Sequence, residues 1–244
     1  MSFTKGLQIK TIYLSIYLLK IKVKENSMIK AIIFDFDGLI IDTETAWYDA
    51  FRETMESYNV ELPLEHFVKG IGSDDIALFQ YFKEQLGERY NPEEIQRKAN
   101  SIHKSKMTKA QARDGVQDYL EEAKKLNYKI ALATSSTTEW VTHYLKELNL
   151  LHYFDALITR DDVEHVKPKP DLYLKAVDVL NVRPNEAVAF EDSLNGLTAA
   201  LTAGLKCVIV PNPVTDALPF ENHHLRLTSM SEMNLHRVIQ HIEK

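Results

Sequence analysis

The sequence contains a single cysteine, Cys207, among 244 residues. An intrachain disulfide is therefore impossible, and a zinc site built from several cysteines is excluded. Cys207 begins the apolar run Cys207-Val208-Ile209-Val210, where we expect a buried strand thiol and not a catalytic one. This scarcity of cysteine is typical of a protein from a reducing compartment, so we expect a cytoplasmic protein.

The chain also lacks a long hydrophobic run and a block of basic residues. Its apolar stretch from Ile12 to Leu19 is shorter than the roughly 20 residues that a membrane-spanning helix needs, so no membrane span is expected. The net charge of −6 makes binding to the phosphate backbone of nucleic acids unfavourable. Apolar residues at 45% and charged residues at 26% are ordinary for a globular protein.

Residues 1–27 differ in charge from the rest of the chain. Five lysines and one acid give this segment a net charge of +4, which leaves −10 for the other residues. A basic start and an apolar middle are typical of a signal peptide, but lysines occupy the place of a small-residue cleavage site. We therefore expect an N-terminal extension outside the fold, with an amphipathic surface-attached segment as the alternative. A chain beginning at Met28 is predicted to fold and keep its activity.

Short apolar runs alternate with helical patterns along much of the chain. The runs that we expect to be strands are 31–34, 130–133, 156–158, 187–190 and 208–210. Continuous apolar runs of this length are typical of strands buried on both faces of a parallel sheet. The helical patterns between them cover 116–126, 138–148, 171–180 and 193–203. This alternation predicts an α/β fold with a doubly wound, Rossmann-like parallel sheet.

Residues 43–112 interrupt the alternation with helical patterns alone. We expect helices over 43–58, 74–86 and 92–112, the last with Pro92 at its favourable first position. Aromatic residues recur in this segment at helical spacing, which indicates a core more than a ligand site. The sequence thus predicts a helical cap over 43–112, inserted into a core formed by 28–42 and 113–244.

Polar or charged residues follow several of the predicted strands. In chain order they are Asp35, Asp37, Thr134, Ser135, Lys167, Glu191 and Asp192. Ligands of an open parallel sheet bind beyond the carboxyl ends of its strands, so we expect these side chains to lie together.

These residue types suit the transfer of a phosphoryl group. Clustered carboxylates repel one another unless a cation lies among them, and hard oxygen ligands favour Mg²⁺. Lys167 can neutralise charge on the transferring group, while the Thr134 hydroxyl and nearby backbone N–H groups hold its oxygens. The candidate metal ligands are Asp35, Asp37, Asp192 and Glu191.

The same residues form four motifs that resemble those of the haloacid dehalogenase superfamily of phosphohydrolases. The first is Asp-Phe-Asp-Gly-Leu-Ile-Ile-Asp-Thr-Glu over 35–44, and the others are Thr134-Ser135, Lys167-Pro168 and Glu-Asp-Ser-Leu-Asn-Gly over 191–196. The resemblance runs from Met28 nearly to the C-terminus. It is greatest to the branch of β-phosphoglucomutases, sugar-phosphate phosphatases and phosphoglycolate phosphatases, and it implies a helical cap inserted after the first motif.

The resemblance also implies roles for the first two acids. Asp35 is the expected nucleophile, which attacks phosphorus and forms an aspartyl-phosphate. Asp37 is the expected acid and base, and members of the family also use its backbone carbonyl as a metal ligand.

The remaining motif residues are expected to bind phosphate and metal. The resemblance assigns Thr134, Ser135 and Lys167 to the phosphate and Asp192 to Mg²⁺. Glu191 is either a further ligand or a residue that holds metal-bound water.

The cap is expected to select the substrate. Trp47 stands where the mutase branch carries a histidine, and acids follow Lys69-Gly70 where that branch places an arginine. We therefore expect a Mg²⁺-dependent phosphatase that acts on a small phosphorylated metabolite, such as a sugar phosphate. A mutase that isomerises β-glucose 1-phosphate and a noncatalytic binding protein are the alternatives.

Four cap residues are candidates for substrate contact: Lys69, Gly70, Ile71 and Trp47. A purely structural turn at 69–71 is equally compatible with the sequence. The sequence does not determine the oligomeric state, and a monomer is the working expectation.

Overall fold

The computed structural model describes residues 28–69, 71 and 76–244, so the predicted N-terminal extension and Gly70 lie outside the described residues. Six strands form one parallel sheet in the order β3-β2-β1-β4-β5-β6. Their bounds are Ala31–Phe34 (β1), Lys129–Ala133 (β2), Ala156–Ile158 (β3), Ala187–Glu191 (β4), Lys206–Ile209 (β5) and Leu225–Arg226 (β6). The chain winds outward from β1 to β3 and then crosses to β4 on the other side, which confirms the doubly wound fold.

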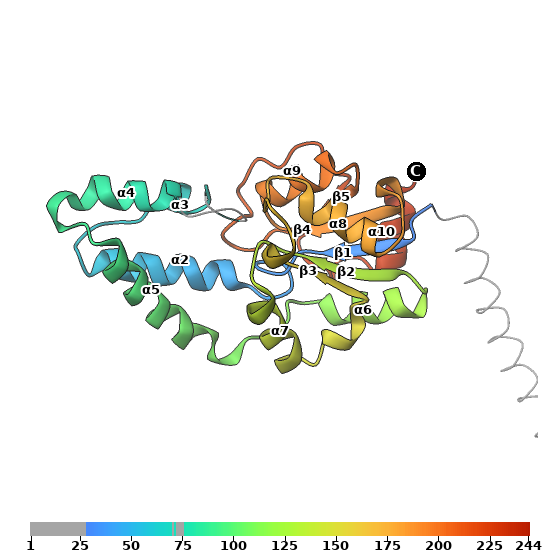
Figure 1. The fold of residues 1–244 in the computed structure, drawn as a ribbon, viewed down its shortest axis with the longest axis horizontal. Helices are drawn as coiled ribbons and strands as arrows, with labels where there is room; N and C mark the ends of the chain where they lie inside the picture. Colours follow the sequence, from blue (N-terminus) through green and yellow to red (C-terminus); the bar gives the residue numbers. More distant parts are fainter. Residues whose placement is uncertain (1–27, 70, 72–75) are drawn as a thin grey trace, which may run out of the picture.

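Helices cover both faces of this sheet (Figure 1). They are α6 (Val116–Lys125), α7 (Thr138–Glu147), α8 (Asp171–Val179), α9 (Leu194–Thr202) and α10 (Leu235–Ile242). On β1, Ile32 and Phe34 pack with α6, α7 and α10, whereas Ala31 and Ile33 pack with α8 and α9. All four side chains are buried, so the strand is apolar at every position.

Two elements of the core were not predicted. Strand β6 is only two residues long, which is too short to leave a pattern in the sequence. Helix α10 has apolar, buried residues at positions 235, 238, 239 and 242, and Asn234 caps it by accepting a hydrogen bond from Arg237 N. This spacing is a sequence signal for a helix, and our prediction missed it.

The helices between β1 and α6 form a second lobe, seen to the left of the sheet in Figure 1. They are α2 (Thr43–Glu56), α3 (Leu64–Phe67), α4 (Ile76–Leu86) and α5 (Pro92–Lys106). Phe51 and Phe82 lie in a hydrophobic cluster within this helical lobe. Phe67 is buried in the same cluster, and the other aromatic residues of the segment pack against it partly buried, in agreement with the core that their spacing predicted.

The last helix of the lobe, α5, is shorter than predicted. It ends at Lys106 and not at Ala112, because Met107–Lys109 forms a 3-10 turn and Ala112 pairs with Ile41 in an antiparallel bridge. This bridge joins the segment that leaves the sheet to the segment that returns to it, and helical backbone at Ala112 could not make it.

No helix among residues 28–69, 71 and 76–244 is long and apolar enough to cross a membrane.

Candidate active site

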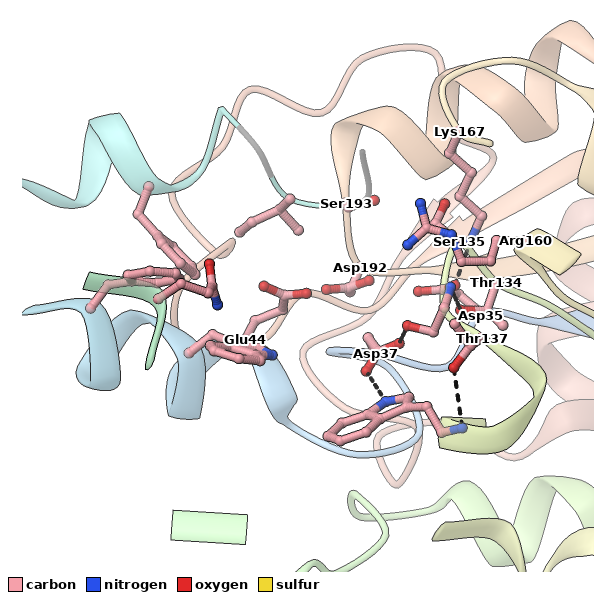
Figure 2. A pocket seen from close by; sticks show the side chains of 17 residues that line it. Asp35, Asp37, Glu44, Thr134, Ser135, Thr137, Arg160, Lys167, Asp192 and Ser193 are labelled. Atoms are coloured by element: carbon pink, nitrogen blue, oxygen red, sulfur yellow. Dashed lines mark hydrogen bonds and ion pairs between the residues drawn. The ribbon is translucent and has the colours of Figure 1, made fainter. Parts of the chain in front are cut away.

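A cavity of about 380 Å³ lies between the carboxyl ends of the strands and the helical lobe (Figure 2). The predicted site residues that line it are Asp35, Asp37, Trp47, Ile71, Thr134, Ser135, Lys167 and Asp192. Glu191 is fully buried next to this cavity, whereas Lys69 is exposed and is not one of the lining residues. The sheet edge therefore brings the predicted core residues together, as the strand ends indicated.

Lys167 links two carboxylates at the floor of the cavity. Its Nζ lies 2.5 Å from Asp35 Oδ1 and 2.6 Å from Glu191 Oε1. Tyr173 OH donates to the same Glu191 oxygen at 2.5 Å, so this carboxylate holds Lys167 in place from below. A Cβ on Gly196 would lie 1.9 Å from the Glu191 carboxyl carbon, which explains why the fourth motif has glycine at this position.

Burial and the neighbouring charges set the pKa values of Asp35 and Lys167. It raises the pKa of Asp35 to about 7, although Lys167 acts in the opposite direction. Burial alone would lower the pKa of Lys167, but Asp35 and Glu191 together raise it, so the ammonium stays charged. A divalent cation beside Asp35 would lower the pKa of its carboxyl group and favour the anion.

Three carboxylates could hold a metal ion. Oxygens of Asp35, Glu191 and Asp192 all lie within 4.8 Å of one another. Asp192 Oδ2 accepts a hydrogen bond from Asn212 Nδ2 at 2.7 Å, whereas its buried Oδ1 has no hydrogen-bond partner among the described residues. Burial, with Asp35 as the next cause, raises the pKa of Asp192 well above its ordinary value. A buried, unsatisfied carboxylate oxygen among other acids fits a hard divalent cation.

Asp37 is held by different partners. Its Oδ2 accepts from Ser136 Oγ at 2.6 Å, and its Oδ1 accepts from Trp140 Nε1 at 2.9 Å (Figure 2). Burial raises the pKa of Asp37, while these two hydrogen bonds lower it by a smaller amount. The Asp37 carboxylate is not one of the three that could hold a metal, and the metal contact predicted for its backbone carbonyl stays a prediction.

The loop after β2 provides hydroxyl groups at the same edge. Thr134 is buried and its Oγ1 accepts from Ser136 N at 3.1 Å, while Ser135 is half-buried and lines the cavity. Thr137 then caps α7 by accepting from Trp140 N at 3.3 Å. The turn that presents these hydroxyl groups therefore also places Trp140 beside Asp37.

Several residues of the site were given no role in the sequence analysis. Ser136 and Trp140 bind Asp37, Asn212 binds Asp192, and Arg160 lines the cavity. Arg160 follows β3 and Asn212 follows β5, so the strand-end rule that found the other residues would have found both.

Arg113 supports the site from outside the cavity, and it was also missed. Its guanidinium donates to the carbonyl of Gly38, to Val210 O at 3.1 Å and to Pro211 O at 2.5 Å. It therefore ties the loop after β1 to the loop after β5. A Cβ on Gly38 would lie 2.1 Å from Asp192 Oδ2, so only glycine allows this close approach.

The helical lobe meets the core through a stack of rings. Trp47 and His103 are nearly parallel, with centroids 3.7 Å apart, and the His103 ring lies 5.8 Å from that of Trp140. His103 is 4% exposed, and burial lowers its pKa to about 4, so the ring is neutral at pH 7. Asn195 Nδ2 also donates to Ile71 O at 2.7 Å. Trp47 and Ile71 thus combine a place in the cavity wall with contacts to the core, direct for Ile71 and through His103 for Trp47.

Comparison with known proteins agrees with this geometry. Residues 32–210 match the model of the haloacid dehalogenase-like hydrolase family. The Bacillus subtilis (strain 168) protein named "Putative phosphatase YhcW" is 48% identical over 216 residues, which cover 88% of this chain and 98% of that protein. The "Phosphorylated carbohydrates phosphatase" of Thermotoga maritima is 32% identical, with 72% of this chain and 82% of that protein covered.

A solved structure shows the same architecture. The crystal structure of CbbY from Rhodobacter sphaeroides in complex with phosphate is 30% identical and has a TM-score of 0.69. The alignment covers 84% of this chain and 96% of CbbY.

Proposed function

The chain belongs to the haloacid dehalogenase-like hydrolases and is a phosphatase, and from that premise we propose that it is Mg²⁺-dependent and works through an aspartyl-phosphate on Asp35. The observation that carries this proposal is the contact of 2.5 Å between Asp35 and Lys167, next to the unsatisfied oxygen of Asp192. This contact supports the proposal because the proposed nucleophile, a cation and a proposed metal ligand would then act together at one end of the cavity.

The first step joins Asp35 to phosphorus. A carboxylate oxygen of Asp35 attacks, the bond from phosphorus to the ester oxygen breaks, and Asp37 gives its proton to the leaving alkoxide. The raised pKa of Asp37 favours the protonated acid that this step requires. Lys167 and the hydroxyl groups of Thr134 and Ser135 hold the oxygens of the transferring group.

The second step restores the enzyme. Asp37, now ionised, takes a proton from a water molecule, whose oxygen attacks phosphorus as the bond to Asp35 breaks. The products are inorganic phosphate and the free Asp35 carboxylate. Ser136 and Trp140 keep the Asp37 carboxylate in position in its ionised state, since both donate hydrogen bonds to it.

Asp35 and Asp192 are the residues that would hold Mg²⁺, with the Asp37 backbone carbonyl as a further ligand. When bound, the ion offsets the repulsion between the acidic cluster and an anionic substrate. We assign Glu191 to the support of Lys167 and of metal-bound water, because its Oε1 already accepts from Lys167 and Tyr173.

The substrate class is a small phosphorylated metabolite, with a sugar phosphate as the first choice. The Thermotoga maritima relative is named for phosphorylated carbohydrates, and a variant of CbbY 29% identical to this chain was solved with xylulose 1,5-bisphosphate. A cavity of about 380 Å³ suits a ligand of this size.

A mutase is the second candidate, because a solved structure 28% identical to this chain carries the name "putative beta-phosphoglucomutase from Thermotoga maritima". Trp47 argues against it, because an indole ring has no titratable group and stands where the mutase branch carries a histidine. Glucose 6-phosphate accumulating from β-glucose 1-phosphate and a bisphosphate activator would assign the mutase instead.

The deciding experiment measures phosphate release from a panel of sugar phosphates and phosphorylated acids, with Mg²⁺ and with a chelator. We expect release only with Mg²⁺, and mass spectrometry of acid-quenched protein should find the phosphoryl group on Asp35. Full activity in the chelator, or a phosphoryl group on another residue, would refute the mechanism.

A further inference from the structure

Arg160 lines the cavity but has no role in the two steps proposed above. It follows β3 as the first residue of the 3-10 turn Arg160–Asp162, and its backbone N donates to Ser136 O at 3.0 Å. Its side chain lines the cavity, and Figure 2 shows the guanidinium directed into it near Ser135 and Lys167. The turn after β3 therefore presents a cation beside the predicted phosphate site.

The acids next to Arg160 in the sequence are bound elsewhere. Asp161 Oδ2 accepts from Thr138 N at 2.8 Å. Asp162 Oδ2 accepts from Thr159 N at 2.9 Å and from Thr159 Oγ1 at 3.0 Å. Both carboxylates are thus held by the start of α7 and by their own turn, which leaves the guanidinium available for a ligand.

Lys167 and Arg160 are the two cations in the cavity wall, and they differ in whether a protein carboxylate balances their charge. Lys167 is in ion pairs with Asp35 and Glu191, so protein carboxylates already balance its charge. Arg160 is exposed and has no ion pair within residues 28–69, 71 and 76–244. A planar guanidinium with five donors is suited to bind a carboxylate or a phosphate through two parallel hydrogen bonds.

We propose that Arg160 binds a second anionic group of the substrate, a carboxylate or a second phosphate, beside the phosphate ester that is hydrolysed. This proposal rests on the proposed function, because it needs Asp35 and Lys167 to bind the ester. It makes Arg160 a specificity-determining residue, and it selects phosphorylated acids and bisphosphates over sugar monophosphates that lack a second anionic group.

The test compares substrates that differ only in the second anion. One pair is 3-phosphoglycerate and glycerol 3-phosphate, and the other is fructose 1,6-bisphosphate and fructose 6-phosphate. We expect the native enzyme to prefer, in at least one pair, the member that carries the second anionic group. Arg160→Gln should lower kcat/KM for that member by about 10- to 100-fold, and for its partner by less than about threefold. The pair that responds tells whether the second group is a carboxylate or a phosphate.

Arg237→Gln is the matched control, because this exposed arginine of α10 lies outside the cavity and its loss changes the net charge equally. An equal loss for both members of each pair would show that Arg160 contacts the transferring phosphoryl group, and would overturn the proposal. No loss in Arg160→Gln, or the same loss in Arg237→Gln, would also overturn it.

A binding measurement separates this proposal from the proposed function. Calorimetry with Asp35→Asn and with Asp35→Asn/Arg160→Gln measures affinity for the same four compounds without turnover. A loss of affinity confined to the compounds with two anionic groups supports the role of Arg160, whereas a uniform loss or none refutes it. Absence of phosphate release by the native enzyme with Mg²⁺ would instead refute the proposed function alone.

Discussion

The two walls of the cavity hold their side chains in different ways. On the side of the sheet, each of the carboxylates of Asp35, Asp37 and Asp192 accepts a hydrogen bond from another side chain. On the side of the helical lobe, Phe51 and Phe67 contribute apolar surface. Under the proposed mechanism, the sheet fixes the groups that do chemistry, whereas the helical lobe shapes the space around the substrate.

Prediction one concerns the sheet wall and has the largest expected effect. Asp35→Asn removes the nucleophile, so kcat should fall by about four orders of magnitude or more in a phosphate-release assay. The fold should survive, because Glu191 still pairs with the buried Lys167 and the acidic cluster holds one charge fewer. Circular dichroism checks this point.

Asp178→Asn is the control for Asp35→Asn, since this exposed residue of α8 lies outside the cavity. It should leave kcat unchanged. Substantial activity in Asp35→Asn would mean that another group attacks phosphorus.

Prediction two tests the acidic cluster through metal and pH. Without metal, the raised pKa of Asp35 stabilises the folded state at low pH, and this stability is lost as the pH rises from about 4 through about 7. The raised pKa of Asp192 acts in the same direction. Mg²⁺ at a hundredfold excess over its Kd adds about 2.7 kcal/mol, or several degrees of Tm. Because protons compete with the ion, we expect the rise in Tm on adding Mg²⁺ to be larger at pH 7.5 than at pH 5.

His103 affects the pH dependence of stability in the opposite direction. Because burial lowers its pKa from 6.5 to about 4, the folded state loses stability as the pH falls below 6.5. The measurement is therefore the change in Tm on adding Mg²⁺ at each pH, in which this contribution cancels. Asp192→Asn should abolish the change. A rise in Tm that persists in this variant would place the ion elsewhere.

The sheet wall could be predicted from the sequence because strand ends define it. Continuous apolar runs located β1, β2 and β4 to within one residue, and the polar residues after them had to meet at one edge. Asp35, Thr134 and Asp192 therefore lie together as expected. The same reasoning would have found Arg160 and Asn212 as well, had it been applied to the residues directly after β3 and β5.

The helical lobe could be predicted only as helices. Its pattern shows which residues are apolar, but not which of them pack inward and which reach the cavity. Phe51 does both, while Lys69, named from its place before a turn, lies outside the cavity wall. Contacts such as the ring of Trp47 on His103 join α2 to α5, so they depend on helix packing that no local pattern encodes.

Prediction three compares one tryptophan from each wall. Trp140→Phe keeps an aromatic ring beside His103 but removes the donor to Asp37 Oδ1, so kcat should fall by about tenfold with little change in KM. Trp47→Phe alters the helical wall and leaves that hydrogen bond intact, so it should change KM more than kcat. Steady-state kinetics of both variants measure the contrast. If the two substitutions change the same kinetic parameter, the proposal that the sheet wall determines kcat and the helical wall determines KM is wrong.

Prediction four concerns the hydrogen bond that joins the two walls, and its expected effect is the smallest. Asn195→Ala removes the donor to Ile71 O, and a single hydrogen bond of this kind contributes about 1 kcal/mol. Because none of the groups that bind Asp35 or Asp37 is touched, we expect KM to rise about two- to fivefold while kcat is kept.

Asn185→Ala is the control for Asn195→Ala, because Asn185 is exposed in the 3-10 turn before β4, away from the cavity wall. A loss of kcat as large as that of Trp140→Phe would show that the helical lobe positions the catalytic acids as well as the substrate. An unchanged KM would show instead that the position of Ile71 does not depend on this bond. In either case the assignment of specificity to the helical wall would have to rest on Trp47 and its neighbours in α2, and not on the segment around Ile71.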